Sequence, residues 1–454
     1  MNLNKTFEEV AIQAKEEVGG QSSISRFVSL TVEQEINLKD WRLVVQKYFP
    51  DLMFPAEVGL SVMAQILIKD ITNPFALVYV DAPSSGKTIT LNFFSQLKDL
   101  VYTTDDFTPA SFVSHSANTK KKDLEKNDLL PQIRYKTIIV RDLAPIFAKR
   151  DEDVQAMLGI LIRVLDGEGY ESNSGLYGKR GYTGDYLFMM LSASTPIRPH
   201  IWKVMGNLGS RLFFLNIGSK GKDVQTLARQ LEKPCRDNEV ICREVTTDTL
   251  KTLWSKYPDG VTWDVATDSQ GLREQIGRIA KTLAKLRATL NVWKEMGSNG
   301  ESYEHTQPVE EHPDRINQLL YNLARGHALV SGRKNIEQED VDVVLRVALD
   351  SGKPTRAQLF KSLIENNGTL KTSQVKELLK CSTNTALKSM EEMRLLGLVH
   401  SEVNLQEAEY HGRPETNVDL VEEFRWLLKP HDGEVVSHSG EISENNLFES
   451  NLTL

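Results

Sequence analysis

The sequence predicts an α/β protein in which a mostly parallel sheet is followed by a helical region and a smaller C-terminal unit. Apolar segments of strand length predict the sheet, and helical stretches separate most of them; they are residues 75–80, 136–142, 186–194 and 211–216. Strands that alternate with helices usually form a parallel sheet with helices on both faces. Strong helical periodicity at 272–292 and 315–330 predicts the helical region that follows.

The length and composition are those of a globular protein with several domains. The chain has 454 residues, of which 40% are hydrophobic and 26% charged, and a globular domain usually contains about 100 to 200 residues. The net charge of −8 excludes a protein whose whole surface coats nucleic acid, so any such contact must be local. Three cysteines without a disulfide pattern, and the lack of an apolar run of about 18 residues, lead us to expect a cytoplasmic protein without a membrane partner.

Composition and periodicity divide the chain into segments of different character. In order, these are an N-terminal helical segment (1–41), an α/β core (42–221), a helical region with an insertion (222–352), a helix-turn-helix unit with a β-hairpin (353–428) and an acidic tail (429–454). Glycine and proline in the polar stretch 297–313 mark it as a loop or an insertion. The polar, acidic tail is typical of a disordered segment.

A phosphate-binding loop is the clearest motif. The strand 75–80 runs into DAPSSGKT at residues 81–88, and a helix follows. A strand, a glycine-containing loop and a helix in this order are the context of a P-loop, whose backbone amides bind phosphate at the start of the helix. We therefore predict that ATP binds at Pro83, Ser84, Ser85, Gly86, Lys87 and Thr88. Lys87 would neutralise the phosphates and Thr88 would bind Mg²⁺, although Asp81 replaces the first glycine of the motif.

Polar residues end the next two predicted strands. Asp142 closes the segment 136–142, where a P-loop ATPase places a carboxylate that binds Mg²⁺ or its water ligands. A glutamate that orients the attacking water usually follows this aspartate, but residue 143 is leucine. Either Asp142 binds the metal and the base comes from elsewhere, or Asp142 is itself the base. Thr195 ends the third strand, at the edge where open α/β sheets bind ligands.

Residues 353–428 are predicted to form a winged helix, because short helical patterns are followed by strand-like sequence. The expected recognition helix, 381–396, carries Thr383, Asn384 and Lys388, which have side chains able to hydrogen-bond to DNA. Between residues 355 and 400, seven basic residues exceed four acidic ones. Two glutamates on the same helix oppose a DNA role, so protein contact or a purely structural role stays as the alternative.

Together these motifs resemble an AAA+ ATPase, and within that group the minichromosome-maintenance (MCM) helicases and the MoxR ATPases. The resemblance runs in order over residues 48–350. DAPSSGKT is similar to the MCM P-loop, and residues 161–196 are similar to the MCM run that leads through a β-hairpin to sensor 1. LGSRLFFL (208–215) resembles the arginine-finger segment. Residues 312–349 resemble the AAA+ lid, in which GHALVSGR is also similar to MoxR proteins.

The resemblance implies roles for single residues. It places Thr195 at the sensor 1 position and Arg315 at the sensor 2 position. Arg211, which by itself would be interpreted as a solvated residue before a strand, becomes an arginine finger that reaches the γ-phosphate of a neighbouring subunit. Lys179 and Arg180 would lie on a hairpin that grips DNA. The family also implies ATP and Mg²⁺ as ligands and a homo-oligomeric ring, such as a hexamer.

Three functions stay open. We favour an ATP-hydrolysing motor that acts on DNA, as an MCM-like helicase or translocase. The alternative is a MoxR-like ATPase that remodels a protein partner or regulates a multi-protein complex, which the acidic charge favours. A third is an ATP-binding switch that no longer hydrolyses ATP, because Asp81, Leu143 and Thr195 replace expected residues.

Overall fold

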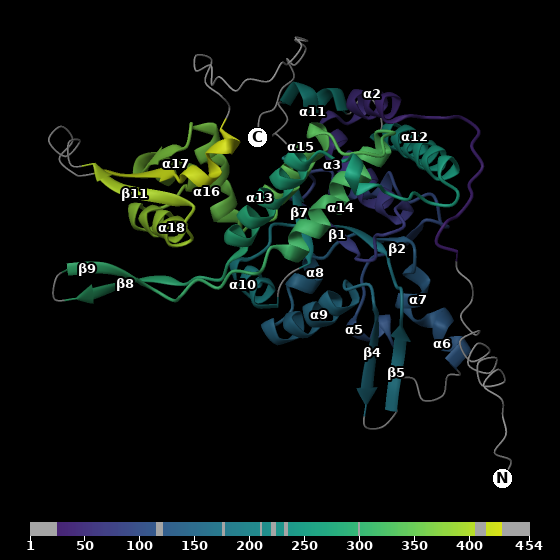
Figure 1. Ribbon diagram of the computed structural model, residues 1–454, viewed down its shortest axis with the longest axis horizontal. Coiled ribbons are helices and arrows are strands. Elements are labelled where there is room, and N and C mark those ends of the chain that lie inside the picture. Colours follow the sequence, from purple (N-terminus) through teal and green to yellow (C-terminus); the bar gives the residue numbers. More distant parts are fainter. Residues whose placement is uncertain are drawn as a thin grey trace.

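The computed structural model describes residues 25–114, 121–174, 178–208, 211–218, 224–230, 235–297, 300–404 and 415–428. The predicted acidic tail, and residues 1–24 of the predicted N-terminal segment, lie outside this part of the chain. The described residues form a central α/β body with a smaller unit at one side and two projecting β-hairpins (Figure 1). In these ranges, no helix combines the length and the apolar character needed to cross a membrane.

A five-stranded parallel sheet forms the centre of the body. Across the sheet, the strands follow in the order β2 (Val101–Thr104), β3 (Thr137–Val140), β6 (Met189–Ser194), β1 (Phe75–Val80) and β7 (Leu212–Asn216). The predicted α/β fold with a mostly parallel sheet is therefore confirmed. The sequence analysis missed β2, because only its first residue is buried and the strand lacks a continuous apolar run.

Helices cover both faces of this sheet. Along β1, Phe75, Leu77 and Tyr79 belong to one hydrophobic cluster and Ala76 and Val78 to another, because alternate side chains of a strand face opposite sides. The first face packs against α2 (Leu38–Tyr48), α3 (Pro50–Ala64), η1 (Gln65–Leu67), α4 (Lys87–Asn92), α12 (Cys235–Lys256), α13 (Gln270–Arg287), α14 (Asp314–Val330) and α15 (Gln338–Asp350). The second packs against α5 (Pro109–Phe112), α7 (Leu129–Ile133), α8 (Ala144–Phe147), α9 (Asp151–Val164) and α10 (Pro199–Leu208). The remaining helices of the body are α6 (Lys121–Asn127), α11 (Val224–Gln230) and η2 (Val265–Thr267).

Two antiparallel hairpins extend from the body (Figure 1). The first pairs β4 (Gly169–Ser174) with β5 (Gly178–Thr183), at the place where the resemblance implied a hairpin. The second pairs β8 (Val292–Gly297) with β9 (Gly300–His305). Within 297–313, predicted as a loop or an insertion, β9 was not predicted. The described side chains of β9 are mostly exposed on both faces of the ribbon. Its sequence therefore does not need, and does not show, the alternation of apolar and polar residues by which a half-buried strand is predicted.

The C-terminal unit has its own core. It consists of α16 (Pro354–Glu365), β10 (Thr369–Lys371), α17 (Thr372–Leu379), α18 (Thr383–Leu395), β11 (Val399–Asn404), β12 (Glu415–Leu420) and η3 (Glu422–Leu427), with an antiparallel sheet in the order β10-β12-β11. Its hydrophobic cluster also contains Leu290 and Val292, and Tyr303 packs against it. The second hairpin therefore packs on the C-terminal unit, although in sequence it lies between α13 and α14.

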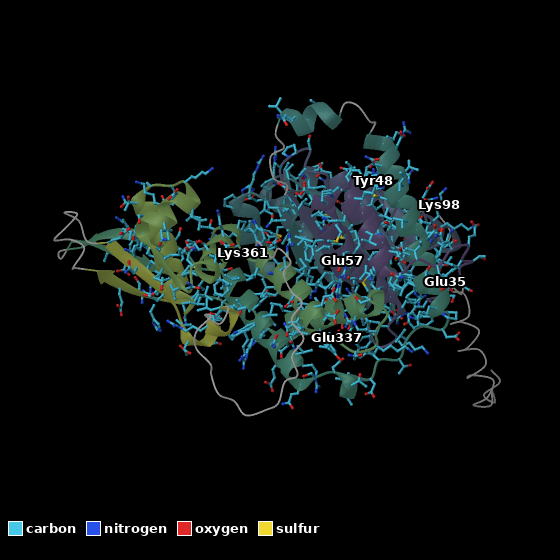
Figure 2. The ribbon with its side chains drawn as sticks, turned by 90° about the horizontal axis from the view of Figure 1, so that it is seen from above. Glu35, Tyr48, Glu57, Lys98, Glu337 and Lys361 are labelled. Atoms are coloured by element: carbon cyan, nitrogen blue, oxygen red, sulfur yellow. The ribbon has the colours of Figure 1, made fainter. Side chains whose placement is uncertain are left out.

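A network of charged side chains, which we call the buried ion network, connects α2 and α3 to α14 and α15. His327 on α14 has no solvent exposure, and its ring nitrogens lie 2.8 Å from Glu57 Oε1 and 2.5 Å from Asp340 Oδ1. Arg42 donates to both oxygens of Glu57, at 2.7 and 2.5 Å, and Arg333 to both oxygens of Asp340, at 2.7 and 3.0 Å. Glu57 lies deep among the packed side chains (Figure 2). Within this network, His327, Glu57 and Asp340 thus each have an opposite charge beside them.

His327, at the middle of the buried ion network, is an imidazolium. Burial alone would lower the pKa of His327, but its hydrogen bonds to Asp340 and Glu57 outweigh burial and raise the pKa to about 9. Both ring nitrogens then donate, one to each carboxylate.

We expect His327→Gln to lower the free energy of unfolding by about 3–5 kcal/mol at pH 7, because it leaves two buried carboxylates without their shared cation. The contribution of the imidazolium is complete below the unfolded-state pKa of about 6.5 and is lost as the pH rises through about 9. Urea unfolding at pH 6, 7 and 10 measures this, and the wild type and the variant should converge at pH 10. Glu339→Gln is the control, since that side chain is 48% exposed and should change stability by less than about 1 kcal/mol. If the difference in unfolding free energy between the wild type and His327→Gln stays constant up to pH 10, His327 is not a buried imidazolium.

Candidate functional site

The predicted P-loop forms a tight turn between β1 and α4. Ser84 (φ 66°) and Gly86 (φ 98°) adopt left-handed backbone conformations, and α4 begins at Lys87. A Cβ atom on Gly86 would lie 2.8 Å from a methyl carbon of Leu52 on α3, so the close approach of loop and helix requires glycine here. The loop lies at the surface, with exposed side chains at Pro83, Ser84 and Thr88 and half-buried positions at Ser85, Gly86 and Lys87.

The side chain of Lys87 folds back across this turn. Its Nζ donates to the carbonyl oxygens of Asp81 at 2.7 Å and Ala82 at 2.6 Å, and to the hydroxyl of Ser85 at 3.2 Å. Burial lowers the pKa of Lys87, and the charges of Asp81 and Asp142 oppose that shift. The ammonium group therefore lies within electrostatic reach of both carboxylates.

The parallel ladder brings the other predicted residues to the same edge of the sheet. Beyond the last paired residues, the N–H of Asp81 donates to the carbonyl of Ser194 at 3.4 Å, and the N–H of Leu143 donates to the carbonyl of Ala193 at 2.7 Å. Thr195, which directly follows β6, is therefore next in line between the ends of β1 and β3.

Asp142 and Thr88 have the oxygen atoms that a Mg²⁺ site at this loop would need, since Mg²⁺ prefers carboxylate, hydroxyl and phosphate oxygens. Both side chains are exposed, and Asp142 Oδ1 accepts the N–H of Ala144 at 2.8 Å, which orients the carboxylate at the end of the strand. Leu143 is only 1% exposed and packs in the second hydrophobic cluster. The position after Asp142 is thus a core position with no polar group to offer.

Arg211 lies at the opposite edge, directly before β7. It is 7% exposed, and its Nη2 and Nε lie 2.7 and 2.8 Å from Asp166 Oδ1 of the same chain. Burial lowers the pKa of Arg211, Asp166 opposes this, and the positive charge of Arg315 lowers it further, so Arg315 lies near Arg211. The sequence offered no signal for the Asp166 partner, which precedes β4. An arginine finger at this position would first have to leave that ion pair.

The predicted DNA-contact residues of the first hairpin are partly neutralised. Lys179 Nζ lies 2.7 Å from Glu171 Oε2 on the facing strand. Arg180 is half-buried and pairs in register with Ser172.

On α18, Thr383, Asn384 and Lys388 are exposed, as a nucleic-acid contact requires. The structure adds a neighbour that sequence reasoning missed. Lys294 Nζ donates to Asn384 Oδ1 at 3.3 Å, and the Tyr303 hydroxyl donates to the Asn384 carbonyl at 3.4 Å. The β8–β9 hairpin thus contacts the N-terminal end of the predicted recognition helix, and no local sequence pattern signals this contact.

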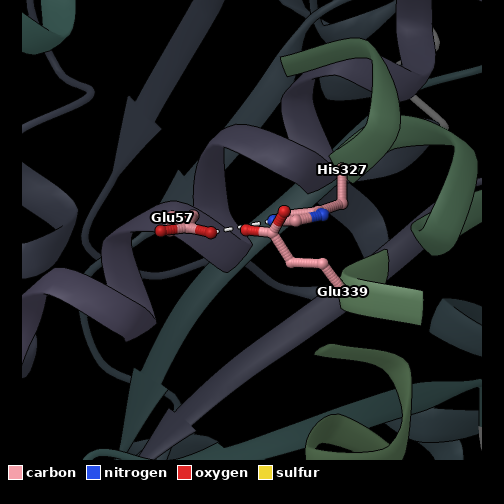
Figure 3. Close-up of side chains that lie close together, drawn as sticks. All are labelled: Glu57, His327 and Glu339. Carbon is pink, nitrogen blue, oxygen red and sulfur yellow. Dashed lines mark hydrogen bonds and ion pairs between the residues drawn. The ribbon is translucent and has the colours of Figure 1, made fainter. Parts of the chain in front are cut away.

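A second group of polar residues also has the spacing of a metal site. Ligand atoms of Glu57, His327 and Glu339 lie within 4.8 Å of one another (Figure 3). Both nitrogens of His327 already contact carboxylates, and Arg42 contacts both glutamates. A doubly protonated imidazole has no lone pair for a metal. These residues therefore fit the buried ion network and not a metal centre.

Neither a scan against protein-family models nor a search of curated proteins finds a match to this chain. The geometry of the site is consequently the basis for any functional proposal.

We expect Gly86→Ala to lower the free energy of unfolding by about 1–2 kcal/mol, because a side chain at positive φ is strained and the new Cβ would press on Leu52. Gly159→Ala is the matched control. Gly159 lies inside α9, where a Cβ would meet nothing within 4 Å, so alanine should stabilise by about 0.5–1 kcal/mol. Chemical denaturation of the two variants measures both changes, and equal shifts in the same direction would contradict the loop geometry.

Proposed function

We propose that this chain is an AAA+-type ATPase that hydrolyses ATP in a homo-oligomeric ring, such as a hexamer, and acts on DNA as an MCM-like helicase or translocase. One observation carries the proposal. Lys87 and Asp142 follow strands that end at one edge of a parallel sheet and lie within electrostatic reach of each other, whereas Arg211 lies at the other edge.

The residues of the first edge would divide the work of binding between them. Backbone N–H groups from Ser84 to Thr88 would bind the phosphates, and Lys87 would exchange its carbonyl contacts for phosphate oxygens. Thr88 and Asp142 would hold Mg²⁺, which neutralises charge that develops on the phosphates. Thr195, beyond β6, would hydrogen-bond to the γ-phosphate.

The position of Arg211 supports an oligomer. β1 and β7 are parallel and in register over residues 76–80 and 212–216, so Lys87 follows the end of one strand and Arg211 precedes the start of the other. A strand rises about 3.3 Å per residue, which separates the two edges by more than about 13 Å. Arg211 therefore would act at the nucleotide of a second copy, after its pair with Asp166 opens.

The C-terminal unit supports a DNA partner. Its order of helix, strand, two helices and two strands is that expected for a winged helix. Asn384, Thr383 and Lys388 are exposed near the start of α18, where the recognition helix of such a domain meets DNA. Arg180 on the first hairpin would add a second contact.

One observation favours the alternative, a MoxR-like ATPase that remodels a protein partner or regulates a multi-protein complex. Asn384 is already bonded to the β8–β9 hairpin, and Lys179 is paired with Glu171, so two of the predicted DNA contacts are occupied within the chain.

We expect Lys87→Ala and Arg211→Ala each to release phosphate at least about 100-fold more slowly than the wild type, because each removes a charge that stabilises the transition state. Mixed in equal amounts, the two variants should recover up to about a quarter of the wild-type rate, since a ring then pairs an intact Lys87 with an intact Arg211 at one interface in four. Phosphate release with ATP and Mg²⁺, read with the mass in solution, measures this.

Arg163→Ala is the matched control, because Arg163 contacts the same Asp166 from an exposed position, and it should keep the wild-type rate. An inactive mixture would refute the composite site. Equal release from the wild type and Lys87→Ala would refute P-loop catalysis altogether.

For DNA, we expect Lys388→Ala to weaken binding and to reduce the slope of log affinity against log salt by about 1, as the loss of one phosphate contact should. Fluorescence anisotropy with duplex DNA between 50 and 200 mM salt measures the slope. Lys98 is exposed and lies on the far side of the body from the C-terminal unit (Figure 2). Lys98→Ala should therefore leave the salt slope unchanged. ATPase activity that a protein partner stimulates and DNA does not, without salt-dependent DNA binding, would favour the alternative.

A further inference from the structure

The proposed hydrolysis lacks a group that orients the attacking water at the usual position. That position is Leu143, whose side chain is 1% exposed in the hydrophobic cluster and whose N–H is bonded to Ala193. No rotation of the leucine side chain can supply the function, so another residue must supply the group. ATP hydrolysis requires a residue that orients the attacking water close to the γ-phosphate.

Asp81 is a carboxylate at the mouth of the P-loop. It follows the last residue of β1, and its N–H continues the ladder to Ser194 of β6. Its carbonyl accepts Lys87 Nζ at 2.7 Å, and its Oδ1 accepts the N–H of Ala82 at 2.6 Å. The backbone of Asp81 thus contacts the lysine that would bind the phosphates, and the bond from Ala82 orients the carboxylate. The charge of Asp81 also raises the pKa of Lys87 against the effect of burial.

The carboxylates that follow β2 and β3, at the same edge of the sheet, have different surroundings. Asp142 after β3 has the exposed oxygens that a metal ion needs. Asp105 after β2 is paired with Arg141 at 3.3 Å and is 79% exposed, and Asp106 bonds to the N–H of Phe107 at 2.7 Å. Among these four described aspartates, Asp81 is the one that contacts Lys87, through its backbone carbonyl.

We propose that Asp81 orients and deprotonates the water that attacks ATP at this site, an assignment that rests on the proposed ATPase function. It would explain why aspartate stands where the P-loop pattern has glycine. The water oxygen forms a bond to the γ-phosphorus while the bond from that phosphorus to the β,γ-bridging oxygen breaks, and the electron pair of that bond leaves with ADP. Asp81 takes one proton of the water and returns it to the phosphate product, so Asp142 is left to hold the metal.

The test compares full-length wild type with Asp81→Asn, Asp81→Glu and Asp81→Gly. We expect Asp81→Asn to bind ATP within about threefold of the wild type, because the backbone contacts stay, and to lower the single-turnover rate of phosphate release by about 100-fold or more. Asp81→Glu should recover part of the rate, since it restores a carboxylate, whereas Asp81→Gly should stay slow although it restores the usual loop residue. A purely structural role would instead change ATP affinity and would not be rescued by glutamate.

Asp105→Asn is the matched control, because it removes a carboxylate from the same edge of the sheet and should keep the wild-type rate. Wild-type hydrolysis by Asp81→Asn, or a faster rate in Asp81→Gly, would overturn the role of Asp81 and leave the proposed function intact. Equal phosphate release from the wild type and Lys87→Ala would overturn the proposed function, and the role of Asp81 with it.

Discussion

The hydrogen-bond ladder that runs past the ends of β1, β6 and β3 is the constraint on which the candidate site depends. Parallel pairing makes all strands end at one edge, and the bonds from Asp81 and Leu143 to β6 continue that order into the loops. Lys87 and Asp142 are far apart in sequence, yet this edge brings them within electrostatic reach of each other. A shift of β6 by one residue would reverse which side chains point into each hydrophobic cluster, so the two buried faces of the sheet also fix the site.

Helix α3 connects this edge to the helical region. Near its start, Leu52 packs against Gly86 so closely that no side chain fits there. Further along, Glu57 contacts His327 within the buried ion network. A Cβ atom on Gly326 of α14 would lie only 2.1 Å from the carbonyl oxygen of Ser61. The same helix therefore fixes the loop on one side and α14 on the other. If the loop 81–88 changes conformation on ligand binding, α3 must either stay in place or shift against its close-packed interface with α14.

The sequence predicted the features that repeat along the chain, because burial imposes them locally. Apolar runs marked four of the five central strands, and helical periodicity marked α13 and α14. β2 and β9 were missed since they are short or exposed and carry no such pattern. The sequence also marked the tight turn between β1 and α4, because glycine is needed at the positive φ of Gly86, whereas phosphate binding there stays a prediction. The partner of Arg211, and the contact of β8–β9 with Asn384, depend on how distant segments pack, and no window of sequence contains that information.

The edge strand β7 connects the C-terminal unit to Arg211, a residue of the proposed composite site. The outer side of β7 is bonded to the end of α15: Phe214 N–H donates to Ser351 Oγ and Asn216 N–H to Asp350 Oδ2, each at 2.8 Å. Asp350 in turn pairs with Lys361 of α16. A displacement of α16 would therefore act on the strand that carries Arg211 at its start. In the proposed ring, Arg211 would have to leave Asp166 before it acts at another molecule. Under that proposal, a movement of this kind is a physical route by which a partner bound at the C-terminal unit would control hydrolysis.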